Sequence, residues 1–310
     1  MFKACYSPRY IAATHTNSME KLHHVAQAVV EQSLVQLVEP DLIDAETLRN
    51  LHDPVYVDAF MTGRMPLASM SRFQWSEQMR DAILAIQGGQ LKAAQIAFTD
   101  GISANIAQGF HHAVYEYGGA FCTFNGLALV AQEFADKNIF VLDCDQHGGN
   151  GTAEFTQRLP NLFNFTIYGL RFGCRDFERS IGRQIPRKEG NFSLYHHALL
   201  DAFKQVLIQK ADLLIYQAGM DCHQHDPYGS PWFDSDLIYQ RDHMVFEFAK
   251  KHGIPVMFVL AGGYQALPDV VKLHVSTFQA ADQVFGADKS ENKPAAKTCE
   301  VASTGAASAI

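Results

Sequence analysis

Two aspartates and a histidine stand at alternate positions in one short segment, in the pattern D-x-D-x-H. They are Asp143, Asp145 and His147, and the apolar run 138–142 leads into them. In an extended backbone, residues two apart point to the same side, so these three side chains can converge on one point. Carboxylate oxygens and an imidazole nitrogen together suit a borderline divalent cation such as zinc. The alternative is an ordinary polar turn between a strand and a helix.

Three more polar clusters follow apolar runs elsewhere in the chain. His111 and His112 are adjacent, and two imidazoles suit proton transfer because their ordinary pKa of about 6.5 lies near working pH. Asp221 follows a second such run and is a natural third metal ligand. Tyr264 follows a third run and a pair of glycines, which let the backbone approach a ligand closely. Taken singly, these residues are typical of a surface loop, a helix cap and a core tyrosine.

The four clusters share one placement, directly after strand-like runs. Open parallel sheets bind their ligands outside the carboxyl ends of the strands, so we expect one shared site. Strand-like runs alternate with helical patterns, which favours an α/β fold with a mostly parallel sheet and helices on both faces. Strands are expected at 1–6, 103–107, 139–142, 162–168, 213–217 and 256–260. Helices are expected at 19–39, 75–87, 90–99, 127–135, 195–210, 236–251 and 267–284.

Together these segments resemble the histone deacetylase family, which has the arginase/deacetylase fold. The resemblance covers about residues 19–279 and includes the order of the motifs. These are His111-His112, Gly118-Gly119-Ala120-Phe121-Cys122, the segment 143–152, Asp221 with Asp226-Pro227, and Gly262-Gly263-Tyr264. The flanking segments 19–21 and 52–57 resemble that family as well. The resemblance implies one catalytic domain over residues 1–285 with about eight strands, and the composition of residues 286–310 predicts a disordered tail.

The resemblance also implies roles for single residues. It implies that Asp145, His147 and Asp221 hold one zinc ion per chain. It implies that His112 serves as general base and acid, and that His111 adjusts the electrostatics and positions the water.

Further positions are assigned in the same way. Asp143 resembles the acid behind His111 and a neighbour of a structural potassium ion. Tyr264 resembles the hydroxyl donor to the substrate carbonyl. Phe121 resembles one wall of the substrate tunnel, next to Ala120, where the family usually has glycine.

Three more positions bear on the branch of the family and on the tunnel. Asn150 stands where class I enzymes have an aspartate behind His112. Tyr168 stands where many members have histidine, a feature of the bacterial and class IV branches. Phe172 is a candidate for the second tunnel wall.

The resemblance implies zinc-dependent hydrolysis of acyl amides, acetyl amides above all, on lysine side chains, with release of a carboxylate and a free amine. A close alternative is deacetylation of polyamines or other small acylated amines. An arginase-type hydrolase needs extra carboxylates for a two-manganese cluster, which the single D-x-D-x-H motif disfavours. A non-catalytic protein that binds acyl-lysine is disfavoured because each catalytic position holds a competent residue.

Composition limits the partners. The chain has 310 residues, 47% of them hydrophobic, and a formal net charge of −8, so we expect a folded globular protein that does not bind nucleic acid directly. Its acidic character favours basic substrates such as peptides and polyamines. The six scattered cysteines predict free thiols in a reducing compartment. The apolar runs are too short for a membrane span, and the first residues resemble a strand, so we expect a cytoplasmic protein.

Overall fold

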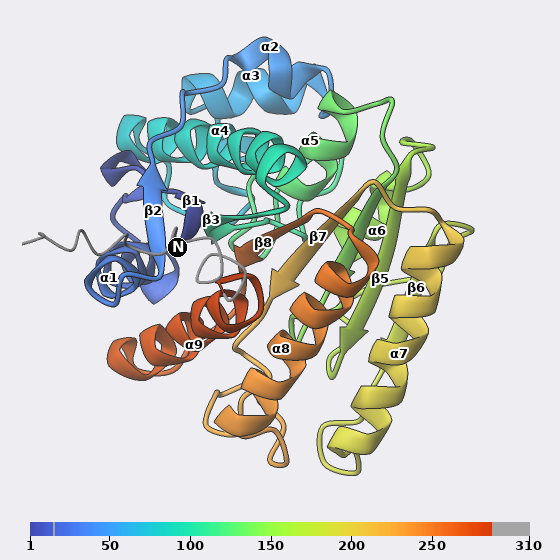
Figure 1. The fold of residues 1–310 in the computed structure, drawn as a ribbon. Coiled ribbons are helices and arrows are strands. Elements are labelled where there is room, and N and C mark those ends of the chain that lie inside the picture. The colour runs from blue at the N-terminus through green and yellow to red at the C-terminus, as the bar shows by residue number, and fades with distance from the viewer. Residues whose placement is uncertain (15, 287–310) are drawn as a thin grey trace, which may run out of the picture.

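A single sheet of eight parallel strands forms the centre of the molecule (Figure 1). A computed structural model of the chain describes residues 1–14 and 16–286. The strand order is β2-β1-β3-β8-β7-β4-β5-β6, and all neighbouring strands run parallel. The strands are β1 (Phe2–Cys5), β2 (Val35–Val38), β3 (Ile102–Gln108), β4 (Ile139–Asp143), β5 (Leu162–Tyr168), β6 (Ser180–Gln184), β7 (Leu213–Ala218) and β8 (Val256–Leu260). This confirms the predicted α/β fold.

Helices cover both faces of the sheet. In Figure 1, α9, α8 and α7 lie in a row on one face, while α4 and α5 lie on the other. The α-helices of the described residues are α1 (Asn17–Glu31), α2 (Ala45–Arg49), α3 (Pro54–Thr62), α4 (Glu77–Asp100), α5 (Gly126–Glu133), α6 (Asn150–Phe155), α7 (Phe192–Ile208), α8 (Ser235–His252) and α9 (Leu267–Gly286). Long connections follow two of the central strands, from β3 to α5 and from β7 to α8, and leave room for a site at the carboxyl ends of the strands.

Two large clusters of buried side chains make up most of the hydrophobic core. Successive residues of β4 alternate between them, because side chains along a strand point to opposite faces. Phe140 and Leu142 pack in the larger part, whereas Ile139 and Val141 pack in the smaller one. Burial on both faces explains why the central strands are continuous apolar runs in the sequence.

One predicted break in a helix is wrong. The pair Gly88-Gly89 was expected to separate two helices, but α4 runs through it without interruption. A Cβ atom on Gly88 would lie 1.9 Å from the carbonyl oxygen of Asp41, and one on Gly89 would lie 1.9 Å from the hydroxyl of Tyr10. The two glycines therefore serve close packing of α4 against its neighbours rather than a turn.

Two edge strands were missed by the sequence patterns. The helix predicted at 19–39 ends at Glu31, and the last residues of that range form β2. Strand β6 is short, polar and only partly buried, so it lacks the apolar pattern of the inner strands. Both are edge strands with a single neighbour, which explains their weak signals.

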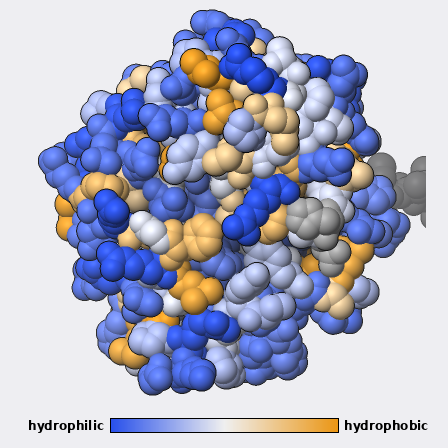
Figure 2. Space-filling model, turned by 180° about the vertical axis from the view of Figure 1, so that it is seen from behind, coloured by the Kyte–Doolittle hydropathy of each residue, from blue (hydrophilic) through white to orange (hydrophobic). Residues whose placement is uncertain are grey.

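The surface is mainly polar. Figure 2, seen from behind, shows a mostly hydrophilic face with small, separate hydrophobic patches. Within residues 1–14 and 16–286, none of the helices combines the length and the apolar character that a membrane crossing requires. The predicted tail lies outside the described residues from position 287 onward, as does Cys299.

A buried histidine holds the long connection between β3 and α5. His52 Nδ1 donates to the carbonyl oxygen of Val114 at 3.0 Å, and the backbone N–H of Asn125 donates to His52 Nε2 at 3.0 Å. Burial lowers the pKa of His52 from 6.5 to about 4. Its imidazole is therefore neutral at physiological pH, with one nitrogen donating and the other accepting.

This histidine predicts a pH-dependent stability. The unfolded chain takes up a proton at the ordinary histidine pKa of 6.5, whereas the folded chain does so only near 4. The contribution of His52 is thus fully present above pH 6.5 and is lost as pH falls towards 4, by about 2 kcal/mol between pH 6.5 and about pH 5. Urea unfolding of wild type and His52→Gln at the two pH values should show a smaller pH dependence in the variant. The control His197→Gln, at an exposed position, should show the same pH dependence as wild type. An equal change in the free energy of unfolding between the two pH values in His52→Gln and wild type would contradict the prediction.

Candidate active site

The four polar segments predicted from the sequence lie together at one edge of the sheet. They follow β3, β4, β7 and β8, which are neighbours in the order β3-β8-β7-β4. All four strands are parallel, so their carboxyl ends meet at the same edge. Residues that are more than a hundred positions apart in the chain therefore surround one pocket.

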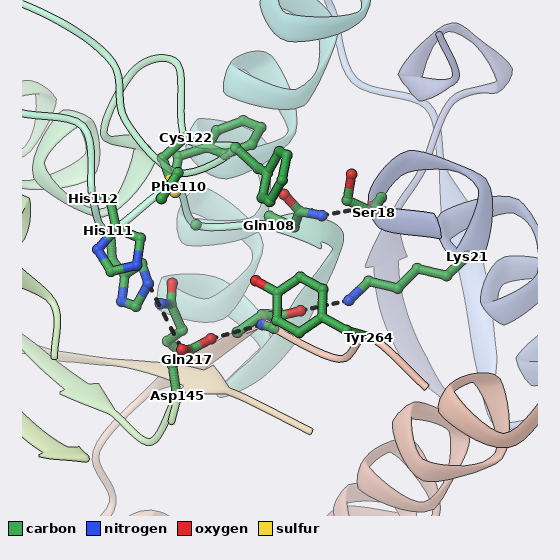
Figure 3. A pocket seen from close by; sticks show the side chains of 15 residues that line it. Ser18, Lys21, Gln108, Phe110, His111, His112, Cys122, Asp145, Gln217 and Tyr264 are labelled. Carbon is green, nitrogen blue, oxygen red and sulfur yellow. Dashed lines mark hydrogen bonds and ion pairs between the residues drawn. The ribbon is translucent and has the colours of Figure 1, made fainter. Parts of the chain in front are cut away.

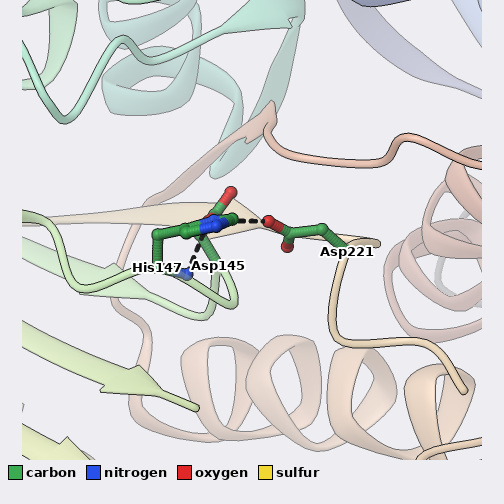
Figure 4. Close-up of side chains that lie close together, drawn as sticks. All are labelled: Asp145, His147 and Asp221. Carbon is green, nitrogen blue, oxygen red and sulfur yellow. Dashed lines mark hydrogen bonds and ion pairs between the residues drawn. The ribbon is translucent and has the colours of Figure 1, made fainter. Parts of the chain in front are cut away.

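Three side chains at this edge form a group that could hold a metal ion. One ligand atom from each of Asp145, His147 and Asp221 lies within 4.8 Å of the others, and all three residues are buried. His147 Nδ1 lies 3.2 Å from Asp145 Oδ1 and 3.0 Å from Asp221 Oδ2. Figure 4 shows the imidazole and both carboxylates turned towards one another. The group contains Asp145 and His147 of the D-x-D-x-H motif together with Asp221, whereas Asp143 lies outside it, with its Oδ2 2.7 Å from His111 Nδ1.

Backbone N–H groups hold the two carboxylates in place. The N–H of His147 donates to Asp145 Oδ1 at 2.9 Å, and the N–H of Gly262 donates to Asp145 Oδ2 at 2.7 Å. The N–H of Gln146 donates to Asp221 Oδ1 at 2.9 Å. Because these donors belong to the backbone, the fold itself orients the carboxylates before any ligand binds.

The electrostatics of the group fit a divalent cation. Burial, and next the charge of Asp145, raises the pKa of Asp221 to about 7. Burial alone would lower the pKa of His147, but hydrogen bonds to Asp145 and Asp221, together with their charges, raise it to about 11. Two buried carboxylates thus require a compensating positive charge. Two carboxylate oxygens and one imidazole nitrogen form a donor set that suits zinc and leaves further coordination positions for water or substrate.

The adjacent histidines have different partners. His111 Nδ1 lies 2.7 Å from Asp143 Oδ2, and His112 Nδ1 lies 2.7 Å from Asn150 Oδ1. Their ring centroids are 3.9 Å apart. The preceding residue, Phe110, has a φ of 60°, in the left-handed region, and this turn lets both rings line the pocket.

The surroundings of the two histidines shift their pKa values in opposite directions. Burial alone would lower the pKa of His111, but the charges of Asp143 and Asp145 raise it above its ordinary value. Burial lowers the pKa of His112 well below its ordinary value, and the positive charge of His111 adds to this effect. At neutral pH His112 is therefore a neutral imidazole. Its Nδ1–H donates to Asn150, which leaves Nε2 as an acceptor.

A hydrogen bond to Asp226 holds the backbone of Tyr264. The N–H of Tyr264 donates to Asp226 Oδ2 at 2.7 Å. Figure 3 shows its hydroxyl directed into the pocket, between the histidine pair and Lys21. Burial, and next the charges of Asp221 and Asp145, raises the pKa of Tyr264 well above its ordinary value. The hydroxyl therefore keeps its proton and can donate a hydrogen bond.

Aromatic rings surround the metal-binding group. The ring of Phe172 lies 4.3 Å from that of His112 and 5.5 Å from that of His147, between centroids, and its side chain is 48% exposed. Tyr228 lies 5.1 Å from His147 and is 44% exposed. Phe172, the predicted second tunnel wall, and Tyr228, which the sequence did not single out, thus both lie against His147.

The inner pocket is small. It is a cavity of about 30 Å³, lined in part by Ala120 and Phe121, the predicted tunnel residues. Both have positive φ angles, 45° and 65°. Non-glycine residues adopt this conformation only when the surrounding structure imposes it, and such residues cluster at functional sites.

Sequence reasoning gave no role to Lys21, which also lines this cavity. It is buried, and its Nζ donates to the carbonyl oxygen of Ala261 at 2.6 Å. Burial lowers its pKa to about 8, although Asp221, Asp145 and Asp226 act in the opposite direction. The sequence did carry a signal: Lys21 lies four and eight residues before Val25 and Val29, so it shares their buried helix face.

Comparisons with known proteins point to one family. Residues 15–278 match the family model described as histone deacetylase domain. An uncharacterised protein of Picosynechococcus is 30% identical over 301 residues, which cover 92% of this chain and 99% of that protein. Histone deacetylase 2 of Arabidopsis thaliana is 27% identical over 76% of this chain and 64% of its own length. The fold is similar to that of an acetylpolyamine aminohydrolase from Burkholderia pseudomallei, with a TM-score of 0.78, 18% identity, and coverage of 92% and 99%.

The close approach of Gly262 to both carboxylates predicts a selective loss of metal binding. A Cβ atom at this position would lie 2.2 Å from Asp221 Oδ2 and 2.7 Å from Asp145 Oδ2. Gly262→Ala should therefore displace both side chains and weaken zinc binding by at least about 10–100-fold, the effect typical of disturbing groups that orient metal ligands. Competition with a chromophoric chelator measures the affinity. Gly119→Ala is the control, because its added Cβ has only His112 O nearby, at 3.8 Å. Wild-type affinity in Gly262→Ala would contradict the geometry described.

Proposed function

Since the chain belongs to the histone deacetylase family, we propose that it hydrolyses acetyl amides on lysine side chains and releases acetate and the free amine. One observation carries the proposal. Asp145, His147 and Asp221 converge beside a neutral His112 and a protonated Tyr264, and Asp145, His112 and Tyr264 line one small cavity. Metal ligands, a proton acceptor and a hydrogen-bond donor are the groups that amide hydrolysis requires.

Zinc bound by Asp145, His147 and Asp221 would polarise the substrate carbonyl and lower the pKa of a water molecule. The remaining chemistry falls to the side chains around it. His112 has a free Nε2 and a lowered pKa, so it is suited to accept the proton of the attacking water. In its protonated form it would then donate that proton to the departing amine nitrogen.

His111 would act differently from His112. Its Nδ1 is hydrogen-bonded to Asp143, and the surrounding carboxylates favour its protonated form. We assign to it the orientation of water and the stabilisation of negative charge rather than net proton transfer. The oxygen atoms of Asp143 also make this residue the proposed neighbour of a structural potassium ion.

Tyr264 would donate a hydrogen bond to the carbonyl oxygen as negative charge develops on it. Its direction into the pocket and its raised pKa support this role (Figure 3). The donor is held by the backbone bond to Asp226, so it needs little reorganisation during the reaction.

The dimensions of the pocket favour a short acyl group. A cavity of about 30 Å³ is too small for a long acyl chain. The aromatic rings of Phe172 and Tyr228 would contact the alkyl part of the amine. A second candidate substrate is an acetylated polyamine, favoured by the fold shared with an acetylpolyamine aminohydrolase and by the net charge of −8. We place the reaction in the cytoplasm, supported by the five described cysteines, all free and buried.

A substrate panel tests the proposal. The purified chain, loaded with zinc, is assayed against lysine peptides carrying acyl groups of increasing length and against acetylated polyamines, with and without chelator. We expect the highest kcat/KM for an acetyl-lysine peptide, a decline with chain length, and loss of activity with chelator. A higher kcat/KM for acetylpolyamines would favour the second candidate, and inactivity towards the whole panel would refute both.

Replacement of Tyr264 by phenylalanine should remove only the hydroxyl donor. We expect kcat to fall about 10²–10³-fold, the loss typical of one donor to a developing oxyanion. Metal content should stay at the wild-type level, because Tyr264 is not among the three metal-binding side chains. Steady-state kinetics and elemental analysis measure both quantities. The surface variant Tyr239→Phe should keep wild-type kcat, and near wild-type turnover in Tyr264→Phe would exclude the assigned role.

Replacement of His112 by alanine should remove the proton acceptor. We expect kcat to fall by about 10²–10⁴-fold, as is typical for loss of general acid–base catalysis. Substrate binding and zinc content should persist, and equilibrium binding of a fluorescent acetyl-lysine peptide together with metal analysis tests this. His24→Ala, on the surface of α1, is the control. Loss of zinc from His112→Ala would show instead that His112 is a metal ligand.

A further inference from the structure

A buried arginine lies directly behind the two loops that carry the metal-binding group. Arg241, on α8, is fully buried. Its Nη1 donates to the carbonyl oxygen of Gly219 at 2.8 Å and to that of Cys144 at 3.3 Å. Cys144 directly precedes Asp145, and Gly219 lies two residues before Asp221. One nitrogen atom therefore joins the loop after β4 to the loop after β7.

The hydrogen bond to Cys144 is linked to the histidine pair through a peptide group and Asp143. The carbonyl of Cys144 and the N–H of Asp145 belong to the same peptide group. That N–H donates to Asp143 Oδ1 at 3.1 Å, and the other oxygen of Asp143 holds His111. Hydrogen bonds arranged in such a chain polarise one another, so the guanidinium charge strengthens each bond along it.

The bond to Gly219 continues towards the other side of the metal-binding group. The carbonyl of Gly219 shares its peptide group with the N–H of Met220, which donates to the carbonyl oxygen of Gly262 at 2.8 Å. The N–H of the same residue, which belongs to the preceding peptide group, donates to Asp145 Oδ2. Arg241 thus reaches the site along two backbone routes, one through each loop.

The arginine is itself fixed by a buried carboxylate. Its Nε and Nη2 both lie 2.8 Å from Asp242 Oδ1. The hydroxyls of Tyr216 and Thr277 also donate to Asp242, the latter at 2.6 Å. With the charge balanced and the planar fork held, the guanidinium has one defined orientation towards the loops.

We propose that Arg241 is a positioning residue, which sets the separation of the loops bearing Asp145 and Asp221 and thereby the affinity of the site for its cation. Two buried carboxylates repel each other, so loops without such a tie would relax apart. The loops are already in close contact, because a Cβ atom on Gly219 would lie 2.5 Å from the Cα atom of Asp145. The inference rests on the proposed function in one respect, that the group binds a metal ion.

Arg241→Lys in the full chain is the decisive variant. Lysine keeps the positive charge beside Asp242 but lacks the rigid fork that serves the carboxylate and both carbonyls at once. We expect its zinc affinity, measured by competition with a chromophoric chelator, to fall about tenfold. Val245→Ala is the matched control: it removes buried atoms from the same helix and leaves the hydrogen bonds of Arg241 in place. It should lower the midpoint of unfolding without changing zinc affinity.

The outcomes separate this inference from the proposed function. Weaker zinc binding in Arg241→Lys with unchanged binding in Val245→Ala supports the inference. Unchanged binding in Arg241→Lys, or an equal loss in Val245→Ala, overturns it while the proposed function stands. If Arg241→Lys does not fold, Thr277→Val decides in its place, since it removes one donor to Asp242 without changing charge; a loss of zinc affinity supports the inference and wild-type affinity overturns it. A wild-type chain that binds no zinc would overturn both.

Discussion

The mutual repulsion of two buried carboxylates is the constraint around which this edge of the sheet is arranged. Asp145 and Asp221 follow neighbouring strands, β4 and β7, which pair in parallel and bring the two acids to the same place. Each carboxylate accepts backbone N–H groups, and His147 lies between them. The fold thus assembles a strongly negative site that is favourable only when a positive ion or a proton offsets it. Its protein ligands, backbone donors and close-packed glycine all serve that one requirement.

The histidine pair shows how a single difference in a hydrogen-bond partner separates two similar side chains. His111 has a charged partner in Asp143, whereas His112 has a neutral one in Asn150. The charge of Asp143 raises the pKa of His111, and His111 in turn lowers that of His112. The protonated form is therefore favoured for His111, while His112 stays free to accept a proton. The amide of Asn150 still fixes which nitrogen of His112 bears hydrogen, so it orients the ring without charging it.

The inner strands, and the closeness of Asp145 to His147, could be predicted because their signals are local. Burial on both faces gives the inner strands continuous apolar runs, and the D-x-D-x-H spacing follows from extended geometry. The strands β2 and β6 were missed since edge strands need less apolar character. The role of Gly88 depends on Asp41, and that of Arg241 depends on two distant carbonyl groups. Such contacts bring together residues far apart in the chain, and a single sequence contains no pattern that pairs them.

The short edge strands have a consequence for self-association. A parallel sheet ends in two rows of unsatisfied backbone groups, which can recruit strands from other molecules and start aggregation. Here β2 offers four residues and β6 five, and β6 carries the exposed Arg183. Templates this short give an incoming strand few hydrogen bonds, and β6, with its polar residues, also offers no continuous apolar surface. The weak strand character that hid these segments in the sequence is thus also what protects the sheet from growing beyond one molecule.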